Sequence, residues 1–272
     1  MKILFLGDIM GRAGRDAVIE YVPKLRAEMK LDAVIVNCEN AAHGFGVNVD
    51  ICKALYDAGV DCLTTGNHVW DQREILSYIE KDKKLLRPIN YPPGTPGNGS
   101  YVIETLKGEK ILVMNAMGQL YMQALDDPFA AVENCLKQYR MGHHVDAVII
   151  DMHAEANSEK MAMAHHFDGR VSLVVGTHTH IPTADAQIFE GGTGYQTDAG
   201  MCGDYNSVIG MQKEAAIMKF TKKVPYQRLQ PGVEEATICG VYIETERKTG
   251  KCKKIEPVRL GGRLKQTTDI SS

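Results

Sequence analysis

The segment KILFLGD at residues 2–8 decides the fold class, because it is a short apolar run without polar alternation. Such a run is typical of a β-strand that is covered on both faces. The next stretch, residues 14–30, carries apolar side chains at helical spacing, and a second apolar run follows at 32–40. Buried strands that alternate with amphipathic helices predict an α/β layered domain.

The same alternation continues as far as residue 180. Further strands are expected at 61–68, 109–118, 145–155 and 171–180. Helices are expected at 48–59, with Asn48 as the N-cap, and at 71–80, 128–140 and 157–167. The Pro/Gly-rich residues 91–100 are interpreted as a surface turn before a new strand, not as a domain linker.

The C-terminal part has a different pattern. Residues 236–260 predict a β-hairpin that turns at Lys248, Thr249 and Gly250, so we expect a second, more antiparallel sheet packed on the first. The edge of this hairpin could pair with another copy of the chain in a homo-oligomer. A single domain is expected over residues 1–272, with a loose tail at 264–272.

The charge and the cysteine content of the chain argue against several classes of protein. The net charge of −3 gives no basis for an extended nucleic-acid surface, although a small phosphorylated ligand is compatible with it. The seven cysteines are scattered and form no CxxC pair, which argues against a zinc ribbon or a disulfide scaffold. Because no apolar run is long enough for a signal peptide or a membrane span, we expect a cytoplasmic protein that does not bind membranes.

Polar side chains able to bind metal stand at the carboxyl ends of the predicted strands. They are Asp8, Glu39, Asn40, Asn67, His68, His153, His178 and His180. In open α/β sheets the functional crevice lies beyond these strand ends. Each residue alone has an ordinary structural explanation, such as a turn or a cap, but their joint occurrence at the ends of five predicted strands favours one shared site.

The histidine pair in GTHTH (176–180) is the strongest single signal. In an extended segment, His178 and His180 would face the same way, about 6.5–7 Å apart. They could then chelate one ion or hold two ions roughly 3.5–4 Å apart. Imidazole, amide and carboxylate ligands together, with one carboxylate able to bridge, suit a two-metal hydrolytic site for phosphoryl chemistry.

The ordered motifs GD (7–8), NCEN (37–40), GNH (66–68), DMHAE (151–155) and GTHTH (176–180) resemble those of the calcineurin-like metallophosphoesterases. Two departures stand out. Met10 replaces the histidine of the usual Asp-x-His motif, and Glu39 followed by Asn40 replaces the usual aspartate. Together with residues 1–15 and 192–203, these departures are similar to the YmdB subfamily of bacterial phosphodiesterases.

The resemblance implies an α/β/β/α sandwich of two mixed sheets flanked by helices. It also implies two metal ions, iron first with manganese or zinc as alternatives, acting on 2′,3′-cyclic or 3′,5′-cyclic nucleotides. The first metal would be held by Asp8, Asn40 and His180, the second by Asn67, His153 and His178, and Glu39 would bridge them. His68 would not bind metal but would donate a proton to the leaving alkoxide, a role worth about 10²–10⁴-fold in rate.

The substrate pocket is expected to include the loop 41–48 with His43, and the Gly-rich segment 191–207 with Tyr195, Asp198 and Asp204. For the loop, ordinary loop structure is the alternative. Two other functions stay open beside a phosphodiesterase. One is a phosphomonoesterase or nucleotidase on the same centre, and the other is a non-enzymatic, metal-dependent regulator. The enzymes would act on a small phosphodiester, cyclic nucleotide or other nucleotide, whereas the regulator would sense a cyclic nucleotide or a partner protein.

Overall fold

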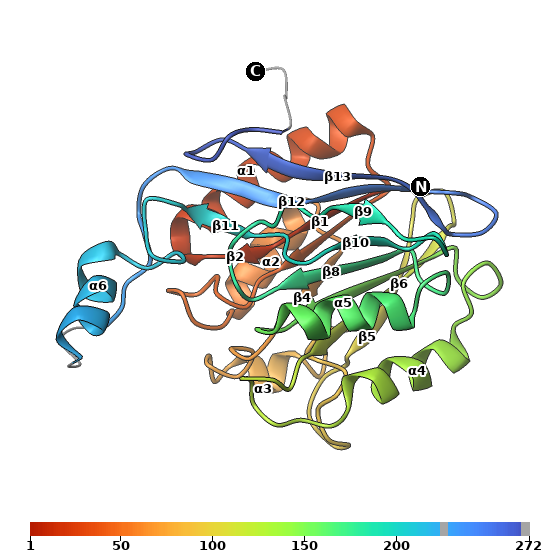
Figure 1. Ribbon diagram of the computed structural model, residues 1–272, viewed down its shortest axis with the longest axis horizontal. Helices are drawn as coiled ribbons and strands as arrows, with labels where there is room; N and C mark the ends of the chain where they lie inside the picture. The colour runs from red at the N-terminus through yellow and green to blue at the C-terminus, as the bar shows by residue number, and fades with distance from the viewer. Residues whose placement is uncertain (224–227, 268–272) are drawn as a thin grey trace.

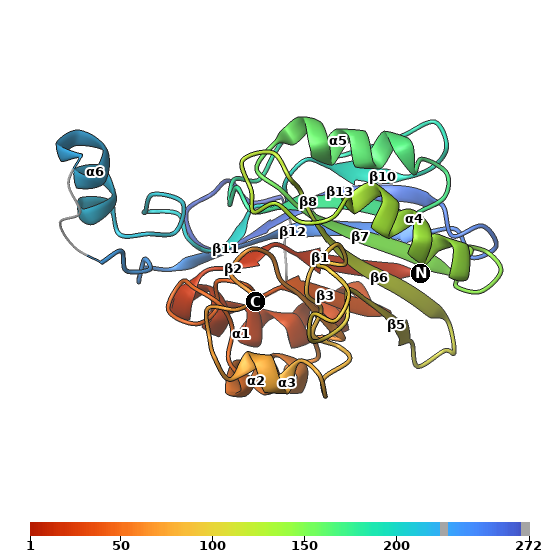
Figure 2. The same ribbon diagram turned by 90° about the horizontal axis from the view of Figure 1, so that it is seen from below.

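Two β-sheets packed face to face form the centre of the computed structural model, which describes residues 1–223 and 228–267 (Figures 1 and 2). Helices cover the outer side of each sheet, and Figure 2 shows α1 and α2 on one side and α4 and α5 on the other. The predicted α/β/β/α sandwich of two mixed sheets is therefore confirmed.

The first sheet unites both ends of the chain. Its strands are β1 (Lys2–Leu6), β2 (Asp8–Ile9), β3 (Ala33–Asn37), β4 (Cys62–Thr64), β11 (Met201–Asp204), β12 (Ala236–Thr245) and β13 (Cys252–Leu260). They run in the order β2-β11-β12-β1-β3-β4, and β13 pairs with β12. The predicted hairpin is confirmed, but the second sheet expected from it is wrong: β12 pairs antiparallel with β1, Lys2 opposite Glu244.

The second sheet comes from the middle of the chain. Its strands are β5 (Ser100–Glu104), β6 (Lys110–Met117), β7 (Ala147–His153), β8 (Leu173–Thr177), β9 (Gln187–Ile188) and β10 (Gly194–Gln196). They lie in the order β5-β6-β7-β8-β10-β9. β6, β7, β8 and β10 are parallel, so their carboxyl ends meet at one edge. The surface turn expected at 91–100 does lead into β5.

Burial on both faces explains the continuous apolar run of β1. Ile3 and Phe5 point into the core between the two sheets, whereas Leu4 and Leu6 pack against the helices outside the first sheet. Because successive side chains of a strand point to opposite faces, two covered faces leave no position for a polar residue.

The helices are α1 (Gly11–Met29), α2 (Val49–Asp57), α3 (Ile75–Tyr78), α4 (Pro128–Gln138), α5 (Asn157–His166) and α6 (Lys213–Lys222). The predicted cap of α2 is confirmed, since the Asn48 side chain accepts a hydrogen bond from the Ile51 N–H at 2.9 Å. The helix expected at 71–80 is shortened to α3. α6, which stands apart from the body of the molecule in Figure 1, was not predicted.

Several expectations stay predictions. They are the single domain, the homo-oligomer and the cytoplasmic location. Most of the C-terminal tail that was expected to be loose, residues 264–272, lies outside the described residues. Among the helices that are described, none is long and apolar enough to cross a membrane.

Candidate metal centre

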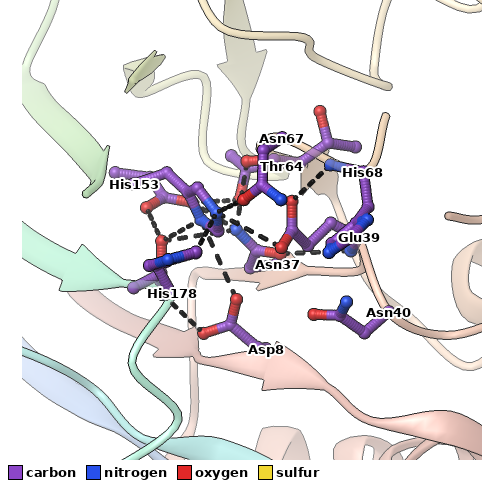
Figure 3. Close-up of polar contacts among 12 residues, drawn as sticks. Asp8, Asn37, Glu39, Asn40, Thr64, Asn67, His68, His153 and His178 are labelled. Carbon is purple, nitrogen blue, oxygen red and sulfur yellow. Dashed lines mark hydrogen bonds and ion pairs between the residues drawn. The ribbon is translucent and has the colours of Figure 1, made fainter. Parts of the chain in front are cut away.

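Side chains from the carboxyl ends of strands in both sheets converge on one point (Figure 3). Asp8 lies in β2 directly after β1, Glu39 and Asn40 follow β3, and Asn67 and His68 follow β4. His153 is the last residue of β7, and the turn that carries His178 and His180 follows β8. The layered topology therefore brings together residues that are up to 172 positions apart in the chain.

The first group of atoms gathers around the imidazole of His153. Its Nε2 atom lies 3.0 Å from Asn67 Oδ1, 3.2 Å from Glu39 Oε1 and 3.1 Å from His178 Nδ1. Ligand atoms of Glu39, His153 and His178 all lie within 4.8 Å of one another. This spacing suits a metal ion bound by nitrogen and oxygen ligands.

Hydrogen bonds on the far side of each ring decide which nitrogen faces the group. The Thr177 hydroxyl donates to Asp151 at 2.6 Å, so it can accept from His153 Nδ1–H at 2.9 Å. His178 Nε2–H can likewise donate to Glu155, 3.2 Å away. The neutral rings then direct unprotonated nitrogens at each other, beside two oxygen acceptors. In this tautomeric state the cluster suits a cation, and outer partners of this kind are usual for metal-binding histidines.

In the absence of a metal, a proton on His153 compensates this cluster. Burial opposes protonation, but the carboxylates of Glu39 and Asp8 outweigh it and raise the pKa of His153 to about 9. Burial likewise opposes ionisation of Glu39, yet His153 lowers its pKa to about 2. Burial and the neighbouring His153 lower the pKa of His178 to about 3. A metal ion would compete with the single proton on His153.

A second group of acceptors lies around His180. Its Nδ1 donates to the Ile209 carbonyl at 2.8 Å, so its Nε2 faces Asn40 Oδ1 at 3.2 Å as an acceptor. The amide of Asn40 is fixed in this orientation because its nitrogen donates to the Gly44 carbonyl at 3.1 Å. Asp8 Oδ1 is buried and has no hydrogen-bond partner in the described part of the chain. Asp8 Oδ1 also lies 3.8 Å from His153 Nδ1, and a buried acceptor without a hydrogen-bond partner fits a bound cation.

The turn that carries both histidines is not extended. β8 ends at Thr177, and His178 and His180 have φ angles of 96° and 67°. The expectation that they face one way as alternate residues of a strand is therefore wrong. Such positive φ values are costly for residues other than glycine and persist only where the surroundings enforce them.

The carboxylate of Asp198 stabilises the turn in this conformation. Its Oδ2 accepts from the backbone N–H of Thr179 at 3.1 Å, from the Thr179 hydroxyl at 2.8 Å and from Lys160 Nζ at 2.8 Å. Lys160 and Asp198 are both fully buried. Because Thr179 lies between the two histidines, this ion pair holds the turn in the conformation that presents them.

A second buried carboxylate supports His153. Asp151 accepts hydrogen bonds from the hydroxyls of Thr177 and Thr64, at 2.6 Å and 2.5 Å, and from the Asn37 amide at 3.0 Å. Burial raises the pKa of Asp151 to about 6. The network fixes the Thr177 hydroxyl, which in turn contacts His153.

His68 lies at the edge of the centre and reaches solvent. Its Nδ1 lies 2.8 Å from Asp71 Oδ2, and its backbone N–H donates to Glu39 Oε2 at 3.2 Å. The ring of Phe45 packs edge-on against it, with centroids 5.3 Å apart. The Nδ1 contact orients the imidazole and leaves Nε2 free to act on a substrate.

A cavity of about 380 Å³ opens above these residues. Six of its lining residues are expected site residues or lie in their turn: Glu39, Asn40, His68, His178, Thr179 and His180. The opposite wall is largely apolar and includes Met10, Phe45, Ile209, Met211 and Leu229. Its lining contains neither lysine nor arginine among the residues that the structure describes.

The four expected pocket residues do not border this cavity. His43 is exposed and lines a separate cavity with Arg12, whereas its neighbours Gly44 and Phe45 line the central one. Tyr195 is fully buried in the core outside the second sheet, and Asp198 is buried below the histidine turn.

Asp204 is also buried, and it accepts hydrogen bonds from the backbone N–H groups of Asn206 and Glu234.

The sequence-based prediction missed Glu155, although this residue belongs to the DMHAE motif. It also missed Met211 and Leu229, for which a local pattern gives no signal.

Comparison with known proteins places this site in a family. A family profile described as YmdB-like protein matches residues 4–258. The chain belongs to the YmdB-like family. It is 42% identical to a 2′,3′-cyclic-nucleotide 2′-phosphodiesterase of Bacillus subtilis (strain 168), over 96% of this chain and 97% of the relative.

Solved structures agree with this YmdB-like membership. A hypothetical protein from Thermus thermophilus superposes with a TM-score of 0.90 at 40% identity, over 97% of this chain and 100% of the other. A novel phosphatase from Mycoplasma pneumoniae gives 0.88 at 35% identity, over 96% and 93%. The expected membership in the metallophosphoesterase superfamily is thereby confirmed.

Proposed function

We propose that this chain is a metal-dependent phosphodiesterase that hydrolyses 2′,3′-cyclic nucleotides and, as a second activity, 3′,5′-cyclic nucleotides. The observation that carries the proposal is the pair of acceptor clusters around His153 and His180, which face a shared cavity. The name of the Bacillus subtilis relative, 2′,3′-cyclic-nucleotide 2′-phosphodiesterase, supports the choice of substrate.

Two metal ions would occupy the two clusters. Asp8, Asn40 and His180 would hold one, Asn67, His153 and His178 the other, and Glu39 would bridge them. Bound there, such ions would polarise the phosphoryl oxygens and make water a nucleophile at neutral pH. The donor set of imidazole, amide and carboxylate suits iron, manganese or zinc.

The protein itself would supply positioning and a proton. His68 lines the cavity next to Glu39, and Asp71 fixes its ring through Nδ1. Its Nε2 can then hand a proton to the alkoxide that leaves when the phosphodiester bond breaks. General acids of this kind contribute about 10²–10⁴-fold to the rate.

The cavity lining favours a diester over a monoester. A phosphate monoester carries about −1.5 to −2 charges at pH 7 and calls for cationic partners, whereas a diester carries a single charge. The lining provides no lysine or arginine within the described residues, and its apolar wall can pack against a nucleoside base. A phosphomonoesterase on the same centre is therefore the weaker alternative.

The test compares rates on bis-p-nitrophenyl phosphate, p-nitrophenyl phosphate and 2′,3′-cyclic nucleotides, with metal content measured in the same samples. The wild type should prefer the diesters, and His68→Ala should lose about 10²–10⁴-fold in kcat while it keeps its metals. His43→Ala is the matched control, because this histidine lies outside the cavity, and it should remain active.

Two results would contradict the proposal. Faster turnover of the monoester would favour the phosphomonoesterase. Nucleotide binding without turnover in metal-loaded protein would favour a regulator.

A further inference from the structure

A second cavity lies at the opposite end of the second sheet from the metal centre. It has a volume of about 640 Å³ and is formed by the end of α4 with the loop after it, the turn before β8 and the turn between β12 and β13. In Figure 1 these segments lie on the right, whereas β8 runs towards the left. Since β7 spans seven residues, about 20 Å separate this cavity from His153.

The lining of this cavity is strongly basic. It contains no aspartate or glutamate in the described part of the chain, and its cationic and imidazole residues are Lys137, Arg140, His143, His144, Arg170 and Lys251. The whole chain carries a net charge of −3. The positive charge is thus a local concentration and not a property of the overall composition.

Most of these cations lack an acidic partner. The charge of Arg170 is compensated, because the Glu133 carboxylate accepts hydrogen bonds from both of its terminal nitrogens, at 2.8 and 2.9 Å. The ammonium group of Lys137 donates only to the neutral amide of Asn134, at 3.1 Å. Arg140 and Lys251 form no ion pair with any residue that the structure describes. Three like charges around one cavity repel each other, and an anion would relieve that repulsion.

The loop that carries Arg140, His143 and His144 is fixed by its own hydrogen bonds. The Arg140 carbonyl accepts from the N–H groups of His143 and His144, at 3.2 and 2.9 Å, and Gly142 N–H donates to the Val145 carbonyl at 2.8 Å. The backbone N–H of Arg140 donates to His144 Nδ1 at 3.0 Å. A neutral His144 therefore keeps its proton on Nε2, as a donor.

We propose that this cavity is a second ligand site, which binds a chain of phosphate groups. The basic residues come from separate segments around the cavity, so they match an anion whose charge is spread over several groups better than a single phosphate. Leu136, Tyr139 and Met141 also line the cavity and offer apolar surface. The ligand is thus either a nucleoside polyphosphate, whose base could pack there, or an inorganic polyphosphate.

Equilibrium dialysis of the full chain with labelled ATP tests the site directly. The wild type should retain ATP at concentrations of about 1 mM or below, and inorganic tripolyphosphate should displace it, whereas adenosine should not. Displacement by tripolyphosphate at the same concentration indicates that phosphates alone bind. Displacement only at higher concentration indicates added contacts to the nucleoside. Both results support the site.

Charge-reversal variants locate the binding. Arg140→Glu/Lys251→Glu should weaken retention of ATP by about tenfold or more, because two favourable contacts become repulsive. The control Lys53→Glu/Lys83→Glu makes the same charge change at exposed positions outside this cavity and should bind like the wild type. Thermal melts should show that both variants are folded.

Three results would overturn the proposal. The first is no retention of ATP by the wild type at about 1 mM. The second is an equal loss in both charge-reversal variants, which would indicate only a general effect of net charge. The third is the same loss in His153→Ala, which would place the ligand at the metal centre instead.

Discussion

Replacing Lys160 by methionine tests the idea that a buried ion pair shapes the metal centre. Lys160 Nζ lies 2.8 Å from Asp198 Oδ2, and both side chains are fully buried. Methionine keeps most of the volume of the side chain but removes the charge. Asp198 then keeps only hydrogen bonds from neutral groups, from the backbone and hydroxyl of Thr179 and from Gly200 N–H.

The expected cost follows from the loss of one partner of a buried pair. Breaking such a pair costs about 3–5 kcal/mol, because the remaining charge stays buried without compensation. Since 1 kcal/mol shifts the melting temperature of a chain of this size by about 2–3 °C, we expect a decrease of about 6–15 °C. A typical domain has about 5–15 kcal/mol of stability, so the variant should still fold.

The assay is thermal unfolding followed by circular dichroism on metal-free protein, because bound metal would add its own stabilisation. Lys24→Met is the matched control. The pair of Lys24 and Glu20 has the same 2.8 Å separation, but both side chains are more than half exposed. Solvent already screens that pair, so the control should melt close to the wild type. Lys160→Met should also bind metal more weakly, because Thr179 is released between the two histidines.

The double variant Lys160→Met/Asp198→Asn adds a second check. Removing both charges avoids an uncompensated ion, so it should recover part of the lost stability. The reasoning would be refuted if Lys160→Met were no more destabilising than Lys24→Met. It would also fail if Lys160→Met lost stability while its metal affinity stayed at the wild-type value.

Four further predictions concern the candidate metal centre. Gly66→Ala should lose bound metal, because the new methyl group would meet His153 Nε2 and Glu39 Oε2, and full occupancy by elemental analysis would contradict this. Glu155→Ala should weaken metal affinity by about 10–100-fold in a chelator competition, since His178 loses its outer partner, and unchanged affinity would rule out that role. Because the pKa of His153 is about 9 without metal, binding of metal at pH 7 should release about one proton per chain. Calorimetry in two buffers measures this proton release, which should vanish above pH 9. The folded pKa lies above the ordinary 6.5, so the metal-free protein should also lose stability as pH rises from 6.5 through 9, and a flat profile would exclude this charge state.

The sequence was sufficient for the strands that deliver the candidate ligands. Runs such as residues 2–6 and 147–153 are largely apolar, and a strand covered on both faces requires that pattern. Polar residues at or just after strand ends, such as His153 and Asn67, were identified as candidate ligands because packing in an apolar core does not require polar side chains there. The structure brings seven of the eight strand-end residues together in Figure 3, and the eighth, His180, lies 3.2 Å from Asn40 Oδ1.

The residues that line the substrate pocket could not be predicted from the sequence in the same way. Tyr195 and Asp198 lie in a Gly-rich segment that looks like a binding loop, yet Tyr195 is buried in the core and Asp198 supports the histidine turn. Met211 and Leu229 form part of the apolar wall, although their own segment carries no chemical signal. Whether a side chain lines a cavity depends on which distant segments pack around it.

The sequence by itself thus determined the α/β class and the set of candidate ligands, because burial periodicity and strand ends are local properties of the chain. Only the tertiary structure decided that the C-terminal hairpin joins the first sheet, where Lys2 lies opposite Glu244. It alone also decided that His178 and His180 adopt positive φ angles, held by an ion pair between Lys160 and Asp198. These features depend on contacts between segments far apart in the sequence, for which local patterns carry no information.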